Sequence, residues 1–417
     1  MHSRIKKLLL ASTLLLLPVT IASAGELKAP EASPAVLSHP AEVKLKVSYK
    51  NGLTIGSADG SSEVKFGGRV FSDWAWFSAE DALPHSPNGT EIRAARIYLK
   101  GNLDENVFFK VNYDFASTKE MDGGPGFKDV YMGLKNVPVV QNVKVGHFWE
   151  PMGIETVTSS KYITFMERSL TSALTPARNS GIQALGTGAD NRLTYAAGVF
   201  RDSDKFGKDT GSGHYAFTGR VTYVPSTNED HTQMIHLGLS ASHRKLNGVD
   251  ASFALRPESH LAAKYIDFDV IPAESTNMVG LEWASVHGPF YTQAEYLMID
   301  VDGESGGVSP SFSSYYAQAS WFATGESKSY SASGASFGRV KPQNPWGSAG
   351  WGALELALRY SAADLRDEGL GDELTDITFG VNWYLTSHAR VMANYVNSDL
   401  DSGGSSDAVM LRFQIDF

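Results

Sequence analysis

Polar and apolar residues alternate along most of this chain, in segments of roughly ten to fourteen residues that continue to the carboxy terminus. Alternation with a period of two predicts β-strands with one apolar face and one polar face. In the segment 64–77, Trp74 and Trp76 share one face, and Arg69 and Asp73 share the other. Such strands exceed the about five or six residues usual in soluble sandwiches, and they suit a tilted crossing of a hydrocarbon layer.

The alternating segments number about sixteen, and they predict an all-β protein, a transmembrane antiparallel β-barrel. Short turns join them at one end and long polar loops at the other, as is typical of bacterial outer-membrane barrels. Two connections, 245–276 and 323–351, are long enough to contain another pair of strands, so about eighteen strands is the alternative. The predicted strands are 64–77, 90–102, 105–116, 126–135, 140–148, 180–189, 191–202, 213–224, 233–245, 276–286, 289–300, 313–323, 350–362, 373–385, 388–399 and 407–417.

One further connection is long and carries many apolar side chains. Residues 146–181 include the end of one predicted strand and the start of the next, whereas an ordinary hairpin loop has about two to five residues. Apolar residues such as Phe165 occur here, with Lys161, Arg168 and Arg178 between them. Because such a segment has to pack against something, we predict that it folds into the barrel lumen as a constriction loop, with its basic side chains toward the opening. A helical cap in a soluble β-protein is the alternative.

The amino terminus has the pattern of a secretory signal. Residues 1–24 begin with Arg4, Lys6 and Lys7, continue as an apolar run and end in Ala-Ser-Ala. Removing these three bases takes the formal net charge from −10 to about −13, which argues against nucleic acid as a partner. The chain has no cysteine, so an exported fold must be stable without disulfides.

The remainder divides into two predicted parts. Residues 25–63 combine a linker rich in Pro, Ala and Ser with a small periplasmic β-element, whose hairpin signal is Asn51-Gly52. Residues 64–417 form the barrel and end in Phe417, which resembles the carboxy-terminal assembly signal of bacterial outer-membrane barrels. No run after the signal approaches the about twenty apolar residues of a spanning helix. We therefore expect a protein of the Gram-negative outer membrane, surrounded by its lipid.

Several motifs spread over the mature chain resemble the porin O and P family, outer-membrane channels that include phosphate- and pyrophosphate-selective members. The resemblance implies a barrel of about sixteen strands, a homotrimer and a third extracellular loop that enters the lumen. The matching motifs are KFGGRV at 65–70, VNYDFA at 111–116, TSSKYITFMERSL at 158–170, PARNSGIQ at 176–183, HLGLS at 236–240, FYTQAEY at 290–296, YYAQASWFATGE at 315–326, GRVKP at 338–342 and GVNWY at 380–384.

The resemblance also implies an anion path, on which selective members place basic residues at the positions of Arg69, Arg93, Arg168, Arg220 and Arg244 and the infolded loop contributes Ser159 and Ser160. Two departures weaken the match to phosphate-selective members. Ala94 follows Arg93 where those members have paired arginines, and Thr156 stands where they have a lysine. Strand alternation turns only one of Arg93 and Arg96 inward, unless a bulge intervenes.

Arginine suits an anion path because its fork of donors matches phosphate and carboxylate oxygens and it stays ionised. We predict passive diffusion of small anions, with phosphate and polyphosphate as candidates; a general, weakly selective porin is the alternative. Any one of these bases could instead pair with an acid on the wall. No cofactor, metal cluster or catalytic Ser-His-carboxylate set is expected, so the chain is not predicted to be an enzyme. The predicted path comprises Arg69, Arg93, Lys110, Ser159, Ser160, Lys161, Arg168, Arg178, Arg220 and Arg244.

Overall fold

The computed structural model describes residues 44–49, 51–116, 124–247, 250–270, 272–347 and 350–417. The predicted signal peptide, 1–24, and the predicted linker that follows it, 25–42, lie outside the described residues. No helix in the described part of the chain is long and apolar enough to cross a membrane.

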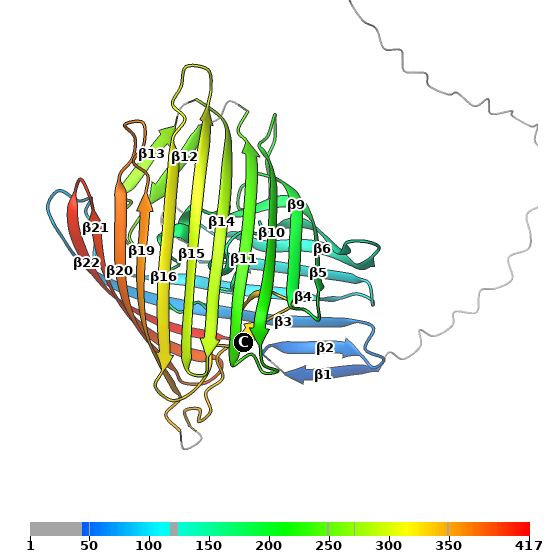
Figure 1. Cartoon of the computed structure of the whole chain (residues 1–417). Coiled ribbons are helices and arrows are strands. Elements are labelled where there is room, and N and C mark those ends of the chain that lie inside the picture. Colours follow the sequence, from blue (N-terminus) through cyan, green and yellow to red (C-terminus); the bar gives the residue numbers. More distant parts are fainter. Residues whose placement is uncertain (1–43, 50, 117–123, 248–249, 271, 348–349) are drawn as a thin grey trace, which may run out of the picture. The chain divides into compact units, whose positions relative to one another are not determined.

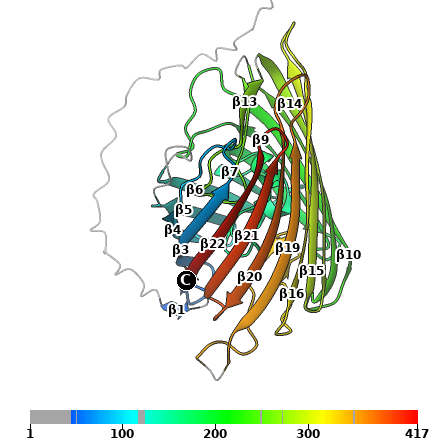
Figure 2. The same cartoon turned by 90° about the vertical axis from the view of Figure 1, so that its left-hand side faces the viewer.

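Antiparallel strands form a sheet that closes on itself, because the last strand pairs with the third (Figures 1 and 2). The sheet contains 18 strands, of which β1 and β2 form a hairpin outside the ring, so sixteen strands make the barrel. The prediction of sixteen strands is confirmed. The barrel strands are β3 (Glu63–Ala79), β4 (Gly89–Asn102), β5 (Val107–Asp114), β6 (Gly126–Val137), β7 (Gln141–Trp149), β8 (Arg178–Gly188), β9 (Leu193–Arg201), β10 (Tyr215–Thr227), β11 (Gln233–Lys245), β14 (Ala273–His287), β15 (Phe290–Gly303), β16 (Ser311–Phe322), β19 (Ala353–Asp364), β20 (Glu373–Tyr384), β21 (Ala389–Leu400) and β22 (Gly404–Asp416).

The two faces of the strands differ as their alternation predicts. Trp74 and Trp76 on β3 each expose 44% of their surface on the outer face, whereas Arg69 and Asp73 expose 7% and 4%. Apolar side chains therefore cover the outside of the barrel, and charged side chains are enclosed in its lumen.

Both long connections contain a pair of short strands, but neither pair joins the barrel. The hairpin of β12 (Ala251–Leu255) and β13 (Ile266–Val270) lies between β11 and β14, and that of β17 (Tyr330–Ser331) and β18 (Ser336–Phe337) lies between β16 and β19. In each hairpin the two strands pair with each other, so the alternative of eighteen barrel strands is wrong.

The connection between β16 and β19 lies at the short-turn end, which corrects the expectation that all long connections lie at the other end of the barrel. This segment leaves β16 beside the short turn between β14 and β15, since Phe290 pairs with Trp321. Figure 1 shows it, in yellow to orange, at the end opposite the β12–β13 hairpin. Tyr330 and Phe337 are nonetheless buried, at 6% and 3% exposure, in one apolar cluster with wall residues. The β17–β18 hairpin of this segment therefore packs into the lumen from the short-turn end.

The hairpin of β1 (Leu45–Tyr49) and β2 (Leu53–Ser57) turns at Asn51-Gly52, as the sequence indicates. β2 continues the line of β22 along β3, because Leu53 pairs with Phe66 while Asp416 pairs with Arg69. The hairpin lies near the carboxy terminus in both views (Figures 1 and 2). Its placement in the periplasm stays a prediction.

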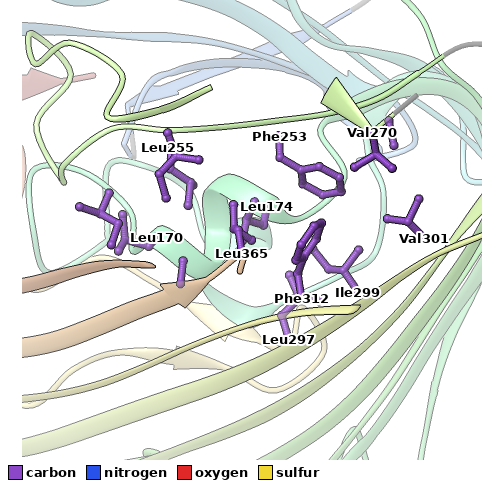
Figure 3. Close-up of a cluster of buried hydrophobic side chains, with 14 of the residues drawn as sticks. Leu170, Leu174, Phe253, Leu255, Val270, Leu297, Ile299, Val301, Phe312 and Leu365 are labelled. Carbon is purple, nitrogen blue, oxygen red and sulfur yellow. The ribbon is translucent and has the colours of Figure 1, made fainter. Parts of the chain in front are cut away.

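Residues 150–177 form the infolded loop, which has two short helices, α1 (Ile154–Val157) and α2 (Leu170–Leu174). Leu170 and Leu174 on α2 belong to an apolar cluster with Phe253 and Leu255 of the β12–β13 hairpin and Phe312 of the wall (Figure 3). The loop and the hairpin thus fill one side of the lumen together.

Candidate functional site

A wall carboxylate fixes the start of the infolded loop. Gly153 adopts a φ of 76°, and a Cβ at this position would lie 2.7 Å from Oε2 of Glu295 on β15. The Glu295 carboxylate accepts hydrogen bonds from the backbone N–H groups of Ile154 at 3.0 Å and Glu155 at 2.8 Å. Glycine is needed here because other residues rarely adopt this φ and because the carboxylate approaches so closely.

A second carboxylate joins the two halves of the loop. Glu155, which is 2% exposed, accepts hydrogen bonds from the Ser169 backbone at 2.9 Å, the Ser169 hydroxyl at 2.7 Å and the Ser172 hydroxyl at 2.8 Å. Arg359 on β19 donates to the same carboxylate at 3.2 Å. Buried charge is tolerated where it is paired and hydrogen-bonded in this way.

Amide side chains of the wall satisfy the loop backbone farther along. Asn382 on β20 donates to the carbonyl of Thr164 at 2.8 Å, and Asn394 on β21 accepts from the N–H of Met166 at 2.8 Å. These contacts hold the loop against β19–β22. The passage that remains therefore lies on the other side of the loop, along β3–β8.

A cavity of about 360 Å³ lies between the loop and β3–β8, and we call it the constriction cavity. Seven of the ten predicted path residues line it: Arg69, Arg93, Lys110, Ser159, Ser160, Arg168 and Arg178. Arg96 and Lys128 line it as well, so seven cationic side chains meet two carboxylates, Asp114 and Asp129.

A β-bulge brings Arg93 and Arg96 into the same cavity. The pairing of β3 with β4 shifts between Phe71 and Ser72, which face Ala94 and Ile92, so Arg93 has no pairing partner on β3. The extra residue changes the alternation, and both arginines line the constriction cavity. The bulge thus places Arg96 beside Arg93 in the cavity, although the residue that directly follows Arg93 is Ala94 and not a second arginine.

Lys128 was not among the predicted residues, although the sequence contains a signal for it. The pairing of β5 with β6 shifts between Val111 and Tyr113, and Lys128 and Asp129 together occupy the shift. Both side chains line the constriction cavity. Two adjacent charged residues within an alternating strand are the visible sign of such a bulge.

Most of these cations are paired. The contacts lie at 2.9 Å for Arg93–Glu167, 2.6 Å for Arg96–Asp114, 2.5 Å for Lys110–Asp129, 2.8 Å for Arg178–Asp129 and 3.8 Å for Lys128–Asp114. Burial alone would raise the pKa of the Glu167 carboxyl, but the charges of Arg93 and Arg412 hold that pKa well below its usual range. Pairing with an acid is the alternative role that the sequence leaves open for each base, and these five bases are paired in that way.

Arg69 and Arg168 are different, because neither has a carboxylate partner among the described residues. Arg69 donates from Nη1 to the Ser160 hydroxyl at 2.7 Å. Its buried Nε has no hydrogen-bond partner among the described residues. Arg168 donates to the backbone carbonyls of Glu155 at 3.0 Å and Thr158 at 2.8 Å. Burial lowers the pKa of Arg168 to about 10, so this guanidinium remains charged at neutral pH.

Three predicted residues lie elsewhere. Lys161 contacts Asp416 at 3.1 Å in a separate small cavity. Arg220 binds Glu282 through two hydrogen bonds, at 2.8 and 2.6 Å. Arg244 binds Glu150 at 2.6 Å and also contacts Asp202. The structure therefore does not bring these three to the constriction cavity, and their role in an anion path stays a prediction.

Two further cavities adjoin the constriction cavity. The vestibule cavity, about 550 Å³, shares Arg93, Trp149 and Arg168 with it and reaches the β12–β13 hairpin. The turn-side cavity, about 420 Å³, shares Asp129 and Trp149 with it and reaches strand ends beside the short turns. The most cationic of the three is thus the smallest, and it shares lining residues with each of the other two.

Trp149 at the end of β7 lines all three cavities. The Arg178 guanidinium lies 4.4 Å from the centre of its ring, and that of Arg168 lies 5.6 Å away. An aromatic face orients guanidinium groups without neutralising them. Sequence reasoning missed Trp149, which is one of several aromatic residues near strand ends.

Comparison with known proteins identifies the barrel. Residues 64–417, the whole barrel, match the sequence model of the family described as phosphate-selective porin O and P. The chain belongs to this family. Porin O of Pseudomonas aeruginosa is 26% identical to this porin over 405 residues, covering 88% of this chain and 89% of the relative. An uncharacterised protein of Caulobacter vibrioides is 27% identical over 407 residues, covering 90% of this chain and 79% of the relative.

Solved structures agree on the fold. An anion-selective porin of Comamonas acidovorans matches with a TM-score of 0.55 at 14% identity, covering 85% of this chain and all of that chain (100%). OmpT of Vibrio cholerae, in its trimer form, matches with a TM-score of 0.54 at 14% identity, covering 86% of this chain and 100% of that one. This porin is therefore an outer-membrane β-barrel of a Gram-negative bacterium, and a channel protein by family.

Proposed function

We propose that this porin is a passive channel for small anions that prefers oxyanions of the phosphate type, and that the constriction cavity sets this preference. The observation that carries the proposal is the cluster of seven cationic side chains around the smallest of three adjoining cavities. Water screens charges least where the passage is narrow and the walls are of low dielectric. The negative net charge of the whole chain lies mostly outside this place.

Phosphate fits the donors of the cavity. Arg69 and Arg168 offer guanidinium groups that carboxylates do not occupy, and Ser159 and Ser160 add hydroxyl groups beside them. Guanidinium forks match the spacing of phosphate oxygens. The family description, phosphate-selective porin, supports the same assignment.

The ion pairs of the constriction cavity favour weak binding of a permeating anion. Arg93, Arg96 and Arg178 each already bind a carboxylate, so an arriving anion has to compete for their donors. A channel conducts when its binding site attracts an ion and also releases it. We therefore expect a modest preference for phosphate over chloride and rapid exchange.

Phosphate block of chloride current tests this function. In planar bilayers, millimolar phosphate should reduce the chloride current of the wild type, and Arg69→Gln with Arg168→Gln should weaken that block about tenfold or more, because charge-assisted hydrogen bonds are lost. Arg366→Gln removes one positive charge from an outer loop and serves as the control. A wild type that phosphate does not block, with a permeability ratio near one, would favour the general diffusion porin.

We also propose that this porin assembles as a homotrimer, because OmpT, which shares its fold, has been solved in a trimer form. The outer faces of β6 and β8 expose Met132 and Ile182 by 68% and 58%. Such apolar faces suit either lipid or a second protomer. The mass of the native protein in detergent decides between one and three copies.

A further inference from the structure

The turn-side cavity contains a cation that no carboxylate occupies. Lys144 on β7 lines this cavity and has no ion-pair or hydrogen-bond partner among the described residues. Its Nζ lies 3.8 Å from the ring centre of Phe148 and 5.1 Å from that of Tyr131. Aromatic faces stabilise an ammonium group but leave its donors free for an anion.

The other charges of the turn-side cavity are already paired. Arg220 binds Glu282, and Asp129 binds Lys110 and Arg178. Among the described residues that line this cavity, Lys144 is therefore the cation whose N–H donors are not already bound to a carboxylate.

An unpartnered acceptor lies directly across from this lysine. Gln183 on β8 is the cross-strand partner of Lys144, is 4% exposed and also lines the turn-side cavity. Its buried Oε1 accepts no hydrogen bond from the described residues. A buried acceptor without a partner is costly, so a ligand that brings a donor group, such as a hydroxyl, to this atom is stabilised there.

The lining of the turn-side cavity is more apolar than that of the constriction cavity. Tyr131, Phe148 and Trp149 line it beside Lys144. Inorganic phosphate has no apolar surface that could cover these rings. A ligand that uses the whole site carries an anionic group, a hydroxyl donor and a carbon face, and a cavity of about 420 Å³ has room for it.

We propose that the turn-side cavity binds phosphate monoesters of sugars or similar polyols. The phosphate lies on Lys144, a hydroxyl group donates to Gln183 Oε1, and the carbon face covers Tyr131 and Trp149. This inference rests on the proposed anion channel, because the ester reaches the cavity through the constriction. It extends the substrate class from inorganic anions to organic phosphates.

The test compares three probes in planar bilayers of the full-length protein: inorganic phosphate, glucose 6-phosphate and glucose. Glucose 6-phosphate should block the chloride current of the wild type at a lower concentration than inorganic phosphate does. Lys144→Met keeps the aliphatic chain over Phe148 and removes the charge. It should raise the half-blocking concentration of glucose 6-phosphate about tenfold and that of inorganic phosphate clearly less.

Gln183→Leu is the second variant, and it should weaken the block by the ester and leave the block by inorganic phosphate within about twofold. Leu134→Ala, on the outer face of β6, is the control for purification of a variant and its insertion into the bilayer, and it should be blocked like the wild type. Equal block by ester and phosphate, or an equal loss of both in Lys144→Met, would overturn the inference while the anion channel stands. A channel that prefers potassium over chloride would instead overturn the proposed function.

Discussion

Arg69 and Arg168 carry the free positive charge of the constriction cavity, although several other arginines line it. Glu167 shows why the neighbours contribute less, since its carboxylate contacts Arg93 at 2.9 Å and Arg412 at 2.7 Å. The carboxylate cancels part of the field that an anion meets. Selectivity therefore depends on which bases are paired as well as on how many are present.

Glu167→Gln tests this reading at the scale of one residue. The amide keeps the shape of the side chain and removes its charge, so the positive charge of Arg93 is no longer neutralised and one of its two donors is released. The anion-to-cation permeability ratio should rise, and phosphate should block chloride current at a concentration several-fold lower. Glu368→Gln, on an exposed loop, should change neither quantity. A fall in the ratio for Glu167→Gln would show that the carboxylate only positions Arg93.

Thr156 shows that matching residues to the family by sequence does not reveal whether a side chain reaches the passage. The sequence marks it as a lost donor, because phosphate-selective relatives have a lysine there. In the structure its hydroxyl lies 2.9 Å from the Thr175 hydroxyl, and the side chain is 1% exposed and does not line the constriction cavity. A lysine at this position would have to displace packed neighbours before it reached the passage.

At the scale of elements, the infolded loop is held by wall groups that its own sequence does not reveal. Its length and apolar content predict that it folds inward, but not that Glu295 caps its start or that Asn394 binds Met166. Strand alternation likewise predicts the barrel but not the bulge at Arg93, because Ala94 and Ala95, which follow it, are small residues that mark neither face of the strand. The β17–β18 hairpin enters the lumen from the short-turn end because its aromatic residues pack against the wall, and no local sequence pattern predicts this packing.

Shortening the loop tests its position. Replacing residues 156–174 by a short Gly-Ser linker removes the side chains that fill one side of the lumen. Single-channel conductance should rise about twofold or more, because the passage widens. Heat-modifiable migration on gels verifies that the variant still forms a barrel. A variant that assembles with unchanged conductance would place the loop outside the passage.

At the scale of the whole molecule, barrel closure depends on the last residues. The Phe417 carbonyl accepts from Gly68 at 2.8 Å, and the Phe417 N–H donates to the Gly68 carbonyl at 3.1 Å. The Phe417 ring lies 6.2 Å from that of Phe66. These contacts complete the ladder between β22 and β3.

Deleting Phe417 should therefore impair closure. The folded, heat-modifiable fraction in outer membranes should fall severalfold, and degraded or aggregated protein should accumulate. Phe417→Tyr keeps the ring and the backbone contacts, so it should assemble like the wild type. Normal assembly of the deletion variant would show that the terminal residue is dispensable.

The reversal potential of wild-type channels under a potassium chloride gradient tests the central claim most directly. The seven cations of the constriction cavity predict a potential of the sign that chloride permeation gives, and this potential should shrink toward zero in Arg69→Gln with Arg168→Gln but not in Arg366→Gln. A wild-type potential of the opposite sign, which means that potassium permeates better than chloride, would contradict the account.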